Sequence, residues 1–162
     1  MKEIIDKVTS YNLFNYLLPG VVFVAVLDKL TIYSFTQENL VIGAFLYYFI
    51  GLVISRFGSL FIEPVLKKIS FLKFSSYADF VSASKKDLSI EIFSEVNNMY
   101  RTFVAMFTLL GILKLYELLA IRFPILNNWS LCILVAFIFA MFLFSYRKQT
   151  QYITKRIDAI KD

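Results

Sequence analysis

Four long apolar stretches constrain this chain more than any other feature of its sequence. They cover residues 13–35, 40–55, 103–121 and 129–146. Because an α-helix rises about 1.5 Å per residue, roughly 17–20 such residues cross a hydrocarbon layer of about 30 Å. The sequence therefore predicts an all-α integral membrane protein, with the four stretches packed as a bundle of four transmembrane helices.

The composition supports the membrane class. Hydrophobic residues make up 59% of the 162 residues and charged residues only 18%. A soluble domain of this size leaves a large share of its surface in water and has no place for so much apolar side chain. Disorder requires the opposite composition, with little apolar surface and high charge.

Basic residues predict the orientation. Four crossings place both termini and the long segment 56–102 on one side of the membrane. That side receives 14 Lys and Arg residues, and the other side receives two. Since an excess of Lys and Arg marks the cytoplasmic face, we expect both termini in the cytoplasm. We attribute the net charge of +5 to this bias, and we expect the lipid bilayer rather than nucleic acid as the direct partner.

The residue inventory argues against catalysis. The sequence has no histidine, one cysteine and five glycines, without a phosphate-binding glycine loop. Cys132 lies inside an apolar run and is interpreted as a small hydrophobic residue. No pair of carboxylates is placed for acid–base work. We expect no enzymatic activity, no cofactor and no metal.

The cytoplasmic segments are expected to be helical extensions of the spans. Segment 56–102 is too short for an independent core, and residues 147–162 are predicted to form an amphipathic tail helix along Ile153, Ile157 and Ile160. Ser84 and Asp87 resemble a capping box that starts a helix. Three acids, Asp87, Glu91 and Glu95, then form a stripe opposite apolar residues. This stripe is either a solvated face or a docking surface for a partner.

Small residues recur every fourth position in two of the stretches. One ridge is Gly51, Ser55 and Ser59, and the other is Cys132, Ala136 and Ala140. Such ridges let helix backbones approach closely in lipid. They predict helix contacts, either within one subunit or between subunits.

Two charged pairs lie inside predicted spans, Asp28 with Lys29 and Lys114 with Glu117. Charge within the membrane is costly and usually faces protein or water. Each pair either neutralises itself or extends outward, or the four residues form a polar lining near the outer end of a bundle or pore.

The most distinctive string is Tyr11–Gly20, which ends in Pro19 and Gly20. Proline removes a helical hydrogen bond and disfavours helix at the preceding residue. We therefore expect a kink here. The chain either lies along the membrane surface and turns inward at Pro19, or forms one kinked helix.

The Tyr11–Gly20 string, the four-span plan and the charged middle segment together resemble the small four-span membrane proteins of bacterial anti-phage defence systems. Examples are the membrane subunit of the Kiwa system and the multi-span effectors of CBASS-like systems. The resemblance implies a homo-oligomer, for which we expect a tetramer, in the bacterial inner membrane. It also implies a sensor or effector role together with a cytoplasmic protein partner. The alternative is a small ion channel or transporter.

Overall fold

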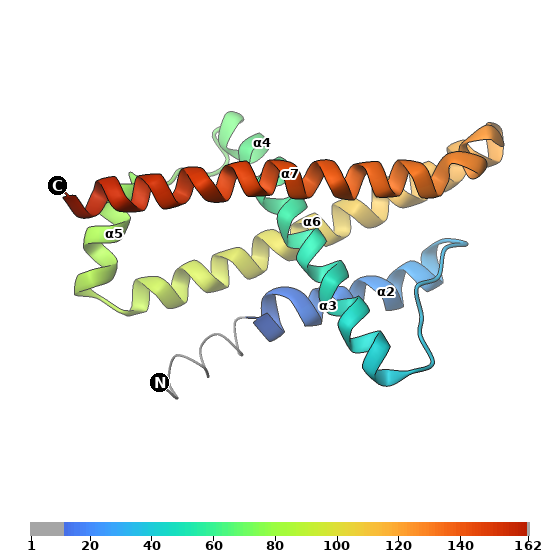
Figure 1. Cartoon of the computed structure of the whole chain (residues 1–162), viewed down its shortest axis with the longest axis horizontal. Helices are drawn as coiled ribbons and strands as arrows, with labels where there is room; N and C mark the ends of the chain where they lie inside the picture. The colour runs from blue at the N-terminus through green and yellow to red at the C-terminus, as the bar shows by residue number, and fades with distance from the viewer. Residues whose placement is uncertain (1–11, 162) are drawn as a thin grey trace.

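Helices make up most of the chain in the computed structural model, which describes residues 12–161 (Figure 1). Four helical segments are long and apolar enough to cross a membrane: Leu13–Leu30, Leu40–Lys68, Ser89–Arg122 and Ile125–Ala159. The expected all-α fold is thus confirmed for this part of the chain. Tyr11 and the side chain of Ile160 lie outside the described residues, so the expectations that involve them are not tested.

The first segment combines a π-helical turn, η1 (Leu13–Leu17), with helix α2 (Leu18–Leu30). A loop over residues 31–39 leads to helix α3 (Leu40–Phe57). Asn39 caps α3, because its side-chain oxygen accepts hydrogen bonds from the backbone N–H groups of Val41 (3.0 Å) and Ile42 (3.2 Å). The predicted first span, 13–35, therefore ends five residues too late.

Both π-helical turns precede a proline by the same spacing. η1 ends two residues before Pro19, and a second turn, η2 (Gly58–Ile62), ends two residues before Pro64 in helix α4 (Glu63–Lys68). A proline within a helix clashes with the carbonyl four residues earlier. In both places that carbonyl lies in the widened turn, which lets the helix continue through the proline. Of the two alternatives for Pro19 and Gly20, the structure has a single helical segment that runs through both residues.

Ser76 and Asp87 stand at the starts of the two helices in the middle of the chain. Helix α5 (Tyr77–Lys86) begins at Ser76, whose hydroxyl accepts the backbone N–H of Asp79 at 3.1 Å. The predicted capping box at Ser84 is wrong, because Ser84 is a buried residue inside α5. Helix α6 (Ser89–Arg122) starts after Asp87, whose carboxylate accepts the N–H of Ser89 at 2.9 Å.

Helices α6 and α7 (Ile125–Lys161) form a long antiparallel pair, which the chain enters and leaves at the same end (Figure 1). With 34 and 37 residues they measure about 51 and 55 Å, well beyond the 30 Å that a bilayer requires. The predicted spans 103–121 and 129–146 are therefore the apolar parts of longer helices. The second predicted span, 40–55, also continues, through η2 and α4 to Lys68. Charged residues end an apolar run without ending helical hydrogen bonding.

The core lies where α2, α3 and α6 meet. It contains buried residues of all three helices, and Met141 is the buried member from α7: Phe23, Val24, Leu27, Ile54, Phe57, Ala105, Met106, Leu110 and Met141. Only 6% of the apolar window of α7 is buried, against 28–39% for the other three segments. The expected four-helix bundle is thus three packed helices with α7 along one side.

Helix α3 crosses the other helices steeply and approaches α2 with almost no space between the backbones (Figure 1). A Cβ atom added to Gly20 would lie 1.8 Å from the Tyr47 carbonyl oxygen, and one added to Gly51 would lie 1.7 Å from that of Tyr16. Real atoms never approach so closely, so both positions require glycine. Gly20 therefore serves helix packing.

Candidate functional site: a charged cluster where the apolar part ends

Five charged residues gather where the apolar parts of the helices end. We call them the charged cluster: Arg56, Glu63, Lys67, Arg101 and Lys148. Arg56 is in α3, Glu63 and Lys67 are in α4, Arg101 is in α6 and Lys148 is in α7. The 21 residues from Arg101 to Arg122 correspond to about 31 Å of helix, close to the thickness of a hydrocarbon layer. The charged cluster thus marks one boundary of the part that fits a membrane.

Glu63 is the acidic centre of the charged cluster and is only 8% exposed. One carboxylate oxygen accepts a hydrogen bond from Lys67 Nζ at 2.7 Å. The other accepts one from the Arg101 guanidinium at 2.8 Å. A buried carboxylate is tolerated when both oxygens are paired in this way. These bonds join α4 to α6 across 38 residues of sequence.

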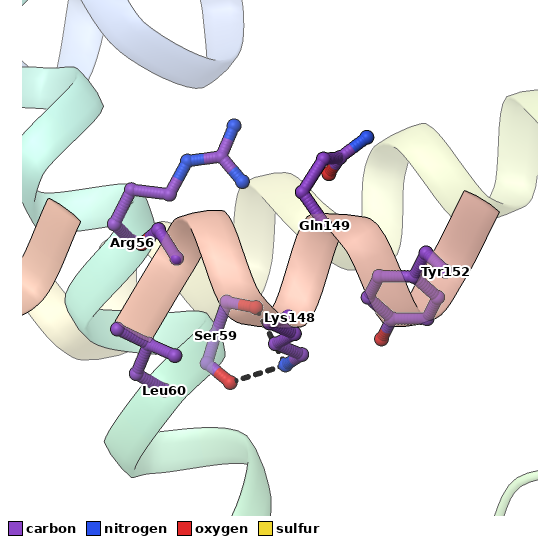
Figure 2. A pocket seen from close by; sticks show the side chains of 7 residues that line it. Arg56, Ser59, Leu60, Lys148, Gln149 and Tyr152 are labelled. Atoms are coloured by element: carbon purple, nitrogen blue, oxygen red, sulfur yellow. Dashed lines mark hydrogen bonds between the residues drawn. The ribbon is translucent and has the colours of Figure 1, made fainter. Parts of the chain in front are cut away.

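Lys148 brings α7 to the charged cluster. Its Nζ donates to the backbone carbonyl of Ser59 at 2.6 Å and to the Ser59 hydroxyl at 2.7 Å (Figure 2). The carbonyl of Ser59 is accessible because it lies in the π-helical turn η2. Lys148 also interacts electrostatically with Glu63 and with the three other cations. The charged cluster therefore couples α3, α4, α6 and α7.

A small cavity of about 10 Å³ lies beside Lys148, with room for about one water molecule. Its lining comes from α3, η2 and α7: Arg56, Ser59, Leu60, Ser145, Lys148, Gln149 and Tyr152 (Figure 2). The Ser145 hydroxyl is buried and has no hydrogen-bond partner among the described residues. Positive charge and free donors suit this place to an anion.

A second charged pair lies near the opposite end of α6. Lys114 Nζ is 2.8 Å from a carboxylate oxygen of Glu117, and Glu117 is only 5% exposed. Tyr116 lies two residues after Lys114. Its hydroxyl donates a hydrogen bond to the Leu126 carbonyl at 2.8 Å, and its ring packs against Tyr33 of the 31–39 loop. The Lys114–Glu117 pair neutralises itself, as one of the interpretations expected, and Tyr116 fastens the α6–α7 turn.

Asp28 and Lys29 form no ion pair with each other in the described part of the chain. Both are exposed at the end of α2, and Asp28 receives a long hydrogen bond of 3.5 Å from Thr36. Among the described residues, no ion pair joins Asp28 or Lys29 to Lys114 or Glu117.

The two small-residue ridges have different surroundings. Gly51, Ser55 and Ser59 are buried within the chain, against Tyr16 at one end and Lys148 at the other. On α7, Cys132 and Ala136 are exposed, and Ala140 is partly buried. The first ridge thus packs helices of one subunit. The second ridge is largely uncovered within one chain.

The acidic stripe is shorter than expected. Asp87 lies outside the helix and caps α6, and hydrogen bonds from Ser89 lower the pKa of its carboxyl. Glu91 is exposed and Glu95 is partly buried on α6. The apolar residues taken as the packed side are instead exposed, Leu88 at 67% and Ile92 at 52%. Exposed apolar residues therefore accompany the acids on this part of the chain.

The sequence interpretation missed the charged cluster because it assigned Lys67, Arg101 and Lys148 to the topology bias alone. One signal was available. Glu63 precedes Pro64 directly, within an otherwise apolar helical extension, and Lys67 follows it at the spacing of an ion pair on one helix face. The partners from α6 and α7 are 38 and 85 residues away and leave no local pattern.

Within the part of the chain that the structure describes, no three His, Cys, Asp or Glu side chains are grouped to hold a metal ion. Comparison with protein-family models, with curated proteins and with solved structures finds no match for this chain.

Proposed function

We propose that this protein is a multi-pass membrane subunit that docks a cytoplasmic partner protein, as a sensor or effector in the bacterial inner membrane. The observation that carries the proposal is the helical layer beyond the charged cluster. We define the helical layer as helix α5, residues 89–100 of α6 and residues 149–161 of α7. These helices extend far past the length that crossing a membrane requires.

The helical layer is held together well enough to present a surface. Val81 and Ser84 of α5 are buried, and Tyr77 of α5 packs against Tyr152 of α7 with ring centroids 6.2 Å apart. The helical layer also carries exposed apolar residues, among them Ile92 and Phe93, which are 52% and 68% exposed. Aromatic and aliphatic side chains of this kind are the usual anchors of protein interfaces.

The place of the protein in anti-phage defence rests on the resemblance in layout, and the homo-oligomer rests on that resemblance and on the uncovered ridge of α7. A tetramer is the state we propose. Both termini in the cytoplasm follow from the distribution of basic residues. The helical layer would then lie in the cytoplasm, where a soluble partner can reach it.

The test compares two exposed phenylalanines in the native operon. We expect Phe93→Ser to abolish co-purification of the protein encoded beside this one and to restore plaque formation by an infecting phage. Phe71→Ser is the matched control, because Phe71 is 73% exposed but lies outside the helical layer. Equal recovery of the partner with both variants would contradict docking through the helical layer. Equal plaque numbers with and without the intact operon would contradict the defence role.

A further inference from the structure

The charged cluster carries more positive charge than its own acid neutralises. Glu63 is its one carboxylate, and both oxygens are taken, by Lys67 and by Arg101. Lys148 is held by the uncharged oxygens of Ser59. Arg56 forms no ion pair among the described residues, although it lies close enough for its charge to act on Lys148. Lys148 and Arg56 therefore remain without a carboxylate partner among the described residues.

The unpaired donors converge on the small cavity. Arg56 and Gln149 line it and point to the same side of α7 in Figure 2, while the Ser145 hydroxyl lies buried within its wall without a partner. The cavity itself admits about one water, so a larger anion would lie at its mouth, between Arg56 and Gln149. A guanidinium is suited to this task, since it binds phosphate oxygens through two parallel N–H groups.

The position of the charged cluster favours a lipid as the source of the anion. Arg56 directly follows the apolar run 40–55, and Lys148 follows the run 129–146 by two residues. Phe49, two turns before Arg56, and Phe142, which stacks on it, are 43% and 37% exposed and can contact acyl chains. Basic pockets between helices at this level are typical sites for the head groups of anionic lipids.

We propose that Arg56 and Gln149, beside the uncompensated charge of Lys148, bind the phosphate group of an anionic phospholipid at the boundary between the apolar part and the helical layer. The bound phosphate would neutralise the excess charge and join α3 to α7. This site does not depend on the docking of a partner protein.

The test titrates the full chain, purified in a neutral detergent, with phosphatidylglycerol, phosphatidylcholine or inorganic phosphate. Native mass spectrometry counts retained lipid, and thermal unfolding reports stabilisation. We expect wild type to retain phosphatidylglycerol selectively. Arg56→Gln should weaken its apparent affinity roughly tenfold, as the loss of one charge-assisted hydrogen bond predicts. This variant leaves both ion pairs of Glu63 intact.

Arg147→Gln is the matched control, because Arg147 is exposed at the same level of α7 but does not line the cavity. It should retain the lipid as wild type does. Equal losses for Arg56→Gln and Arg147→Gln, or equal retention of both lipids by wild type, would overturn the proposal. Saturable stabilisation by inorganic phosphate, lost in Arg56→Gln, would keep the phosphate site but overturn its lipid source. If Arg56→Gln does not fold, Gln149→Ala at an exposed position provides the same comparison.

Discussion

At the scale of single residues, two glycines decide how closely the first two spans pack. Gly20 faces the carbonyl of Tyr47, and Gly51 faces the carbonyl of Tyr16, so each helix contributes one glycine and one carbonyl. The rings of Tyr16 and Tyr48 then meet edge to face at 5.5 Å beside this crossing. In lipid, where apolar burial gives little drive for helix association, such close packing is a main source of stability.

We expect Gly51→Ala to destabilise the protein by about 1–3 kcal/mol, because the added methyl group forces the two backbones apart. Gly20→Ala should behave alike. Gly111→Ala is the control, since nothing lies within 4 Å of its added Cβ and alanine favours a helix over glycine. Thermal unfolding in one detergent measures all three. An unchanged melting temperature for Gly51→Ala would contradict the close crossing.

At the scale of elements, α7 differs from the other spans in how little of it is covered. Besides Met141, which is buried, and Lys148, its contacts with the rest are mainly aromatic, such as Phe142 on Phe49 of α3 and Tyr152 on Tyr77 of α5. No other described part of the chain covers the exposed ridge of Cys132 and Ala136. A second copy that packs against this ridge would complete a four-helix arrangement between subunits.

We therefore expect Ala136→Leu to reduce the oligomer in nanodiscs while the melting temperature of the subunit stays near that of wild type. A leucine facing lipid costs little, but it prevents close approach of another helix. Ser55→Leu should have the reverse effect, a lower melting temperature, because Ser55 is buried between helices of the same chain. Wild-type oligomer size for Ala136→Leu would exclude the α7 ridge as the interface.

At the scale of the whole molecule, α5 and the end of α7 lie toward one end, and the α6–α7 turn lies at the other (Figure 1). The charged cluster separates the apolar part from the helical layer. If the basic residues set the orientation, the helical layer lies in the cytoplasm.

Cysteine labelling in intact cells tests this orientation, with Cys132→Ser as the cysteine-free background. In that background we expect Asn128→Cys, near the α6–α7 turn, to react with a membrane-impermeant maleimide. Ser75→Cys, in the exposed loop before α5, should react only after lysis. The opposite pattern would reverse the orientation.

Much of this molecule follows from sequence alone, because the relevant signals are local. Runs of apolar residues identify the four segments that are long and apolar enough to cross a membrane, since length and hydropathy are properties of consecutive residues. The prolines at 19 and 64 mark the places where the helices contain π-helical turns. The i, i+3 spacing of Lys114 and Glu117 brings their side chains together on one helix face.

What only the tertiary structure decided depends on residues that are distant in sequence. Gly51 was one of several small residues in a ridge, and only its contact with Tyr16 shows why a side chain there is impossible. Glu63, Arg101 and Lys148 come from three helices, and no spacing rule links them. How the helices cross decides which of their faces are covered. For this reason the ridge that begins in α3 is buried and the ridge of α7 is exposed, although both have the same sequence pattern.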